Sequence, residues 1–248
     1  MPRYSPLRFR VFDTCRLRYR YQYVDRIPAR LRPPDTAGSL VHRVLCDFFS
    51  KVPTDERQTE RLTGLFEAGW AALSPRYLRM TGVESLRESA VEQLRSFAAT
   101  RDLTAEPLAV EPYFQVEVAA GATLFGRVDR IDEEPDGSLH LIDYKTGSHE
   151  DEVDARQLRL YAIMAEASLG KPVGRLSFWY LDDGQTWTAE FTDESRGSSR
   201  AELMAAIHEM EQATDFPANI GVHCGHCPYL HACAERDEIA RRREAEGW

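Results

Sequence analysis

Asp129, Asp143 and Lys145 are the residues of this sequence whose types and spacing best suit chemistry on a charged substrate. Side chains alternate along a strand, so Asp143 and Lys145 share one face. Asp129 lies across from Asp143 in an expected hairpin, and two opposed carboxylates repel unless a cation lies between them. Carboxylate oxygens suit Mg²⁺, so the pattern indicates a divalent-metal site, with a surface salt-bridge cluster as the alternative.

The hairpin that brings these residues together has its turn at Pro135-Asp136-Gly137. Pro fixes φ and Gly accepts a positive φ, which suits a tight turn. We expect the two strands of the hairpin at 123–133 and 138–145. A turn centred on Asp136 sets the register that places the two metal-binding aspartates opposite each other.

The remaining elements follow from the spacing of the apolar residues, since a period near 3.6 predicts a helix and a period of two predicts a strand. The order of elements indicates an α/β protein with a mixed central sheet. A helix between two strands also predicts a βαβ crossover, so the strand at 176–180 should run parallel to that at 138–145. One helix is expected to begin at Gly38, and four others are expected at 57–72, 84–100, 153–168 and 195–212. Further strands are expected at 113–118 and 187–191.

The 248 residues contain no internal repeat, low-complexity tract or Gly/Ser linker, and 43% of them are hydrophobic, enough for a buried core. We expect a single domain with a mainly helical part at 1–110, an α/β core at 111–213 and a cysteine-rich C-terminal part at 214–248. The N-terminus lacks an apolar signal segment, and no run approaches the roughly 20 apolar residues that span a bilayer. A cytoplasmic protein without a membrane partner is therefore expected.

Charge is distributed unevenly along the chain. Nine arginines and two aspartates give residues 1–32, the basic arm, a net charge of +7, whereas the rest carries −16 and the whole chain −9. Aromatic rings among these arginines suit single-stranded DNA, because bases stack on rings and phosphates bind guanidinium groups. We expect Arg16 and Arg18 to contact DNA, with weak and salt-sensitive binding overall. The rings that lie among these arginines include those of Phe9, Phe12, Tyr19, Tyr21 and Tyr23.

Four motifs occur in an order that closely resembles the RecB-like branch of the PD-(D/E)XK nucleases. The resemblance implies the restriction-endonuclease-like fold of that group and the metal-dependent hydrolysis of DNA. The motifs are Gly38 with His42, Gly126-Arg127-Val128-Asp129, Asp143-Tyr144-Lys145-Thr146-Gly147, and Gln157 with Tyr161.

This resemblance assigns roles to individual residues. Lys145 positions or activates the attacking water. Gln157 and Tyr161 share one helical face and contact the substrate backbone, although packing in the core is the alternative. Glu117 is a further acid beyond the direct ligands. The implied ligands of Mg²⁺ or Mn²⁺ are His42, Asp129, Asp143 and the main-chain carbonyl of Tyr144; a lone helical histidine is otherwise structural.

Three cysteines near the C-terminus resemble, together with Cys15, the [4Fe–4S] site of AddB-type and CRISPR-adaptation nucleases of the same superfamily. Four thiolates are the ligands that such a cluster requires. The implied ligands are Cys15, Cys224, Cys227 and Cys233. Zinc is the alternative, because His223, His226 and His231 surround this segment. Cys46 is expected to be a small buried apolar side chain outside the cluster.

The expected function is that of a metal-dependent deoxyribonuclease, acting as an exonuclease on single-stranded ends in repair, recombination or CRISPR adaptation. No Walker A loop occurs, so a helicase partner would be a separate polypeptide. Two other classes of protein fit the same residues: a catalytically inactive DNA-binding module of this fold, and a zinc-bound interaction domain.

Overall fold

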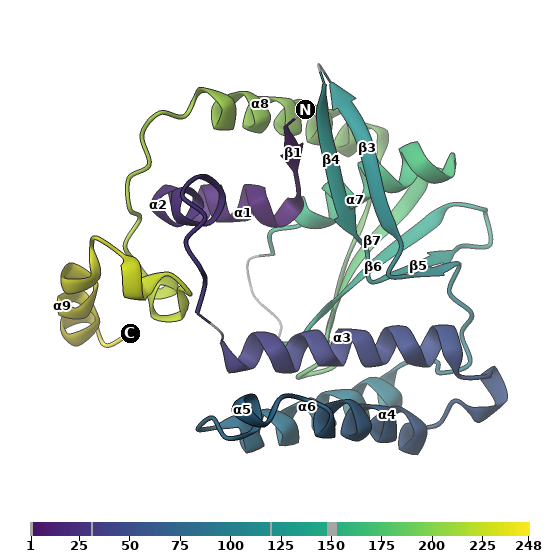
Figure 1. The fold of residues 1–248 in the computed structure, drawn as a ribbon. Coiled ribbons are helices and arrows are strands. Elements are labelled where there is room, and N and C mark those ends of the chain that lie inside the picture. The colour runs from purple at the N-terminus through teal and green to yellow at the C-terminus, as the bar shows by residue number, and fades with distance from the viewer. Residues whose placement is uncertain (1, 31, 120, 148–152) are drawn as a thin grey trace. The chain divides into compact units, whose positions relative to one another are not determined.

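The computed structural model describes residues 2–30, 32–119, 121–147 and 153–248 (Figure 1). The chain divides into two compact units: unit 1 comprises Met1–Arg3 with Pro33–Arg200, and unit 2 comprises Tyr4–Arg32 with Ala201–Trp248. These boundaries cut across the three predicted parts, because most of the basic arm groups with the C-terminal residues.

Helices occur in both units, and no helix in the described residues is long and apolar enough to cross a membrane. The helices that lie wholly in unit 1 are α3 (Pro33–Lys51), α4 (Thr59–Ala71), α5 (Pro75–Leu78), α6 (Val83–Thr100) and α7 (Arg156–Leu169), with a 3₁₀ turn at Thr54–Glu56. The others are α1 (Pro6–Thr14), α2 (Arg16–Tyr19), a π-helix (Arg20–Val24), α8 (Asp193–Gln212) and α9 (Arg236–Glu246), with 3₁₀ turns at Val222–His226 and Leu230–Ala232.

The strands form two sheets. One has the order β1-β4-β3, and the other has the order β2-β5-β6-β7-β8. The pair β6–β7 is parallel and the other pairs of the five-stranded sheet are antiparallel, which confirms the mixed sheet and the predicted crossover. The strands are β1 (Arg3–Tyr4), β2 (Ala109–Val110), β3 (Tyr113–Ala119), β4 (Ala122–Arg127), β5 (Arg130–Glu133), β6 (Leu139–Lys145), β7 (Val173–Tyr180) and β8 (Thr186–Glu190).

The prediction of one continuous strand over 123–133 is wrong, because the chain breaks there into β4 and β5, which lie in different sheets. At the break, Val128 N donates to Pro112 O at 3.3 Å, and Glu111 N donates to Asp129 O at 2.8 Å. The backbone of Glu111 and Pro112, just before β3, therefore forms hydrogen bonds with the residues at the break. The break leaves Asp129 outside both ladders, at the start of β5.

The predicted hairpin register is confirmed for β5 and β6. Arg130 lies opposite Ile142 and Glu133 opposite Leu139, as a turn centred on Asp136 requires. Gly137 has φ +83, and its N–H donates to Glu134 O at 2.9 Å, so the turn uses the conformation that glycine permits.

Alternation along β6 directs its side chains to two layers. Ile142 and Tyr144 are buried in the hydrophobic core formed by α3, α4 and α6. Leu141 and Asp143 are buried on the opposite face, where α7 packs against β6 and β7 (Figure 1). The strand thus carries one face of core residues and one face that ends in site residues.

Two helices begin at different residues from those predicted. Helix α3 begins at Pro33 rather than Gly38, because proline suits the first turn of a helix, where its missing N–H is not needed. Helix α7 begins at Arg156, whose N–H is bonded to the Asp154 carboxylate at 2.9 Å. The predicted start, at 153, directly follows residues 148–152, which lie outside the described residues.

Candidate active site

The end of β6, the start of β5 and helices α3 and α7 bring the predicted site residues of unit 1 together. Lys145 Nζ lies 2.7 Å from Asp143 Oδ2 and donates to Gln157 Oε1 at 3.0 Å. Gln157 Nε2 donates to Asp143 Oδ1 at 2.9 Å and lies 3.2 Å from the Tyr161 hydroxyl. One glutamine of α7 therefore fixes both the acid and the amine of β6.

Asp129 joins this group from the other side of the hairpin. Its Oδ1 lies 3.0 Å from His42 Nδ1, and its Oδ2 accepts a hydrogen bond from Tyr144 N at 2.7 Å. The break between β4 and β5 makes the second bond feasible, because Asp129 is not held in a ladder. Since His42 uses Nδ1 for Asp129, Nε2 is the ring nitrogen left for another ligand.

Burial and mutual charge shift the pKa values of the acidic centre. Burial, followed by the negative charge of Asp129, raises the pKa of Asp143 to about 6, although Lys145 opposes this shift. Burial lowers the pKa of His42, but the hydrogen bond and charge of Asp129 outweigh burial, so the net shift is upward. The side chains of Asp143 and Asp129 are 7% and 15% exposed, whereas those of Lys145 and His42 are 28% and 27% exposed, so the network meets solvent at both its lysine and its histidine.

Two motif glycines allow close packing around the site. A Cβ on Gly126 would lie 2.8 Å from Tyr161 Cε1, and a Cβ on Gly38 would lie 3.0 Å from Thr146 Oγ1. Both distances are too short for a side chain without movement of the neighbour. Glycine at these positions lets β4 approach α7, and α3 approach the segment after β6.

Comparison with known proteins identifies the family. Residues 3–234 match the family described as the PD-(D/E)XK nuclease superfamily. The chain belongs to this superfamily. Its fold is similar to the crystal structure of a candidate exonuclease from Eubacterium rectale, with a TM-score of 0.56, 11% identity, and coverage of 90% of this chain and 86% of that chain. The structure of SSO0001 gives a TM-score of 0.38 at 16% identity, covering 81% of this chain and 96% of that chain. No curated protein matches the sequence.

The site suits the Mg²⁺ or Mn²⁺ that PD-(D/E)XK nucleases typically use. Asp129 and Asp143 supply hard oxygen donors, and their mutual repulsion favours a cation between them. Among the described residues, no group of three or more His, Cys, Asp or Glu side chains is arranged to hold a metal ion. Mg²⁺ does not need such a group, because it commonly binds one or two carboxylates together with water and phosphate.

One site residue of the nuclease was not anticipated from the sequence. The Lys145 ammonium lies 4.4 Å from the centre of the Phe178 ring, a cation–π distance. Phe178 pairs with Asp143 in the parallel register of β6 and β7. The sequence held a clue to this contact: β7 was predicted to run parallel to β6, and residues paired across parallel strands direct their side chains to the same face of the sheet.

Glu117 and Arg16 are not brought into the network. Glu117 is exposed on the side of β3 opposite the buried Phe114, and in the described residues no hydrogen bond joins it to the site. Arg16, in unit 2, forms an ion pair with Glu209, and its guanidinium lies 4.0 Å from the centre of the Phe12 ring.

Much of the aromatic content of the basic arm forms the core of unit 2. Phe9, Phe12 and Tyr19 are 1%, 1% and 4% exposed, so their rings are not accessible to bases. Tyr21 accepts a hydrogen bond from Ala234 N at 3.2 Å. The expected stacking surface for single-stranded DNA is thus reduced to the part-exposed rings of the arm.

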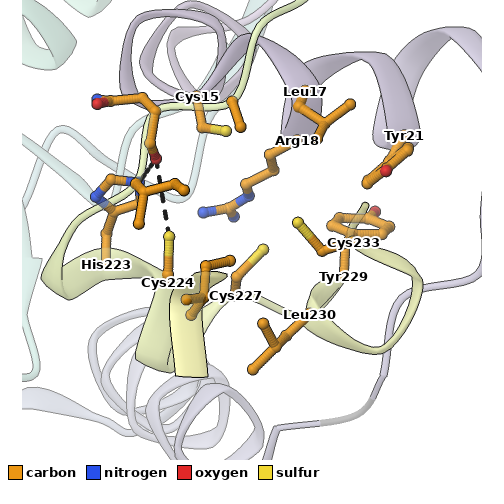
Figure 2. Close-up of a pocket in the computed structure, with 14 residues that line it drawn as sticks. Cys15, Leu17, Arg18, Tyr21, His223, Cys224, Cys227, Tyr229, Leu230 and Cys233 are labelled. Atoms are coloured by element: carbon orange, nitrogen blue, oxygen red, sulfur yellow. Dashed lines mark hydrogen bonds between the residues drawn. The ribbon is translucent and has the colours of Figure 1, made fainter. Parts of the chain in front are cut away.

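The four predicted cluster cysteines line a single pocket in unit 2 (Figure 2). Backbone contacts join the two ends of the chain beside it: Leu17 N donates to Pro217 O at 3.2 Å, and Arg30 N donates to Pro228 O at 3.1 Å. All five cysteines are free thiols, and Cys46 lies outside the pocket on α3. The donor set therefore fits a group that binds several thiolates. The cysteine pocket is lined by Cys15, Cys224, Cys227 and Cys233, with Arg18, Leu17, Tyr21, Tyr229, Leu230 and Ile239 among its other walls.

Proposed function

We propose that this chain is a metal-dependent deoxyribonuclease whose active site is built on Asp129, Asp143 and Lys145. The observation that carries the proposal is the single network in which Gln157 bonds both Asp143 and Lys145. A salt-bridge cluster on a surface would not require a buried carboxylate with a raised pKa. The geometry favours a catalytic site over that alternative.

Each residue has a distinct role in the proposed hydrolysis. Asp129, Asp143, His42 and the Tyr144 carbonyl would hold Mg²⁺ or Mn²⁺, which when bound lowers the pKa of water and neutralises charge on the phosphoryl oxygens. Lys145 holds positive charge where the attacking water is positioned. Gln157 orients Lys145 and Asp143, and Tyr161 orients Gln157.

We further propose that the preferred substrate is a single-stranded DNA end. The motif resemblance to RecB-like nucleases and the fold of the candidate exonuclease from Eubacterium rectale support exonuclease rather than endonuclease action. Arginines of the arm supply phosphate contacts. Repair, recombination and CRISPR adaptation are the expected settings, with any helicase as a separate chain.

The second part of the proposal is a [4Fe–4S] cluster on Cys15, Cys224, Cys227 and Cys233. Four thiols from both ends of the chain line one pocket, which supports this assignment. The described side chains do not converge on one metal ion. In a [4Fe–4S] cluster each iron takes one thiolate, so its ligands lie farther apart than the four ligands of one zinc ion. The motif resemblance is what favours the cluster over zinc.

The test of the nuclease is degradation of end-labelled single-stranded DNA beside a circular form of the same strand. Anaerobically purified wild type, Asp143→Asn and the exposed-residue control Asp55→Asn are compared with Mg²⁺ and with Mn²⁺. We expect the wild type and Asp55→Asn to degrade only the linear strand, and Asp143→Asn to degrade neither.

Other results would change the assignment. Cutting of both forms would make the protein an endonuclease. Binding without cleavage in the wild type would favour the inactive DNA-binding module. Zinc without iron in the purified protein, together with no cleavage, would favour the interaction domain.

A further inference from the structure

Arg18 places a permanent positive charge in the cysteine pocket. Figure 2 shows its side chain reaching from α2 so that the guanidinium ends among the sulfur atoms of the four cysteines. Arg18 Nε is buried, and the described part of the chain offers it no hydrogen-bond partner. None of the fourteen described residues that line the pocket is Asp or Glu.

An arginine in these surroundings is costly in the absence of negative charge. Guanidinium does not lose its proton in proteins, so it cannot avoid the cost by becoming neutral. Arg18 as a whole is half-buried, and its buried Nε–H loses the solvation it had in water without gaining a hydrogen bond in the described residues. The walls beside it, including Leu17, Leu230 and Ile239, offer no compensation. The groups in the pocket that can supply negative charge are the cysteine sulfurs when they bind metal as thiolates.

We infer that Arg18 is the counter-charge of the metal-loaded cysteine pocket and not a contact for DNA phosphate. This inference rests on the proposed cysteine cluster. Four thiolates outweigh the positive charge of an iron–sulfur core, so the loaded pocket is net negative in a largely apolar surrounding. The Arg18 guanidinium neutralises part of that charge and offers N–H donors to the sulfurs.

The electrostatic role has a consequence for redox behaviour. Adding an electron makes the loaded pocket more negative, and a nearby positive charge stabilises that reduced state. Charge and hydrogen bonds at the sulfurs are known to set the reduction potential of such clusters. Loss of the Arg18 charge should therefore shift the midpoint potential to more negative values and weaken retention of the cluster.

Arg18→Gln tests this role, with Arg18→Lys to restore the charge and Arg20→Gln as a matched control. Arg20 lies two residues away, and its exposed side chain pairs with Asp25 at 3.1 Å. Full-length proteins are purified anaerobically and checked by circular dichroism. The measurements are iron and zinc content, the rate of metal loss to a chelator, the midpoint potential, and the affinity for labelled single-stranded DNA.

We expect Arg18→Gln to lose metal severalfold faster than the wild type and to have a more negative potential. Arg18→Lys and Arg20→Gln should match the wild type in both, and Arg18→Gln should bind DNA no more weakly than Arg20→Gln. Unchanged retention and potential in Arg18→Gln would overturn the inference, and weaker DNA binding alone would restore Arg18 as a phosphate contact. If Arg18→Gln does not fold, Arg18→Lys still tests the inference, because lysine keeps the positive charge. A midpoint potential of Arg18→Lys that differs from that of the wild type would count against a role of charge.

The metal content separates this inference from the proposal beneath it. If the wild type contains zinc in place of iron, and Arg18→Gln loses zinc faster, the proposal of an iron–sulfur cluster is wrong and the role of Arg18 as counter-charge is kept. A wild type that contains neither metal would overturn both.

Discussion

The Tyr161 ring lies where a side chain at position 126 would begin, because a Cβ on Gly126 would come within 2.8 Å of Tyr161 Cε1 and 3.1 Å of Met164 Cε. This contact connects β4 with α7. The hydroxyl of the same tyrosine lies 3.2 Å from Gln157 Nε2, so a displaced ring disturbs the amide that holds Asp143. Gly126 thus acts on the site through packing.

Gly126→Ala should reduce DNA cleavage and lower the free energy of unfolding by about 1–3 kcal/mol, the usual cost of overpacking a filled core. Chemical denaturation and single-turnover cleavage measure the two effects. Gly64→Ala is the control, since a Cβ there meets nothing within 4 Å. It should leave activity unchanged and raise stability slightly, as alanine does in a helix. If Gly126→Ala cleaved DNA at the wild-type rate, the Tyr161 ring would have to move aside without disturbing the position of Gln157.

Lys145→Ala should reduce the cleavage rate by about 10²–10⁴-fold, because the positive charge beside the attacking water is lost. Binding to DNA should remain close to that of the wild type, since one part-buried lysine contributes little to the total charge of the surface. Rates and affinities are compared at one salt concentration. Equal turnover by the variant would remove Lys145 from the mechanism.

The sequence predicted more of the site than of the connections around it. Strand alternation placed Asp143 and Lys145 on one face, and the i, i+4 spacing placed Gln157 and Tyr161 on one helical face, because both are local rules. That this helical face meets Asp143 was implied by the family resemblance, and the structure brings them together. The break after β4 was not predictable, because it depends on the distant pairing of Glu111 with Asp129.

The basic arm shows a second limit of sequence patterns. Its arginines and rings have the composition of a DNA-binding surface, yet composition does not show which side chains pack inward. Tyr19 packs 5.0 Å from Phe12 between ring centres, and Arg18 lies in the cysteine pocket. The long-range part of both positions comes from the C-terminal residues: the Tyr19 ring also stacks 6.1 Å from that of Phe216, and the pocket around Arg18 is completed by Cys224, Cys227 and Cys233.

His140 should make stability fall as the pH decreases. Burial, followed by the positive charge of Arg175, lowers the pKa of His140 to about 4, even though Glu134 lies 3.4 Å from its Nδ1. The unfolded chain binds a proton near pH 6.5 and the folded chain does not until about pH 4, so the stability present above pH 6.5 is lost progressively between these values. The full loss is about 3 kcal/mol at most.

His140→Gln provides the comparison, because it removes the titration while an amide still reaches Ser177, whose Oγ lies 2.8 Å from His140 Nε2. Urea unfolding at pH 7 and pH 5 should give the wild type a steeper fall in stability than the variant. Carboxylates elsewhere contribute equally to both proteins. An identical fall in both would show that His140 takes up its proton at the same pH in the folded and the unfolded chain.

Cys15→Ala should remove iron and stability together, because Cys15 is the one predicted ligand from the N-terminal end of the chain. A metal that binds only the folded state stabilises it, and its loss removes that contribution. Cys46→Ala is the control, since Cys46 lies outside the pocket. Iron content, absorbance and the melting temperature are measured on anaerobically purified proteins. Cys46→Ala should match the wild type in all three. A full iron content in Cys15→Ala would show that the cluster is held without the N-terminal arm, and the pocket walls from 218 to 239 would then have to supply its fourth ligand.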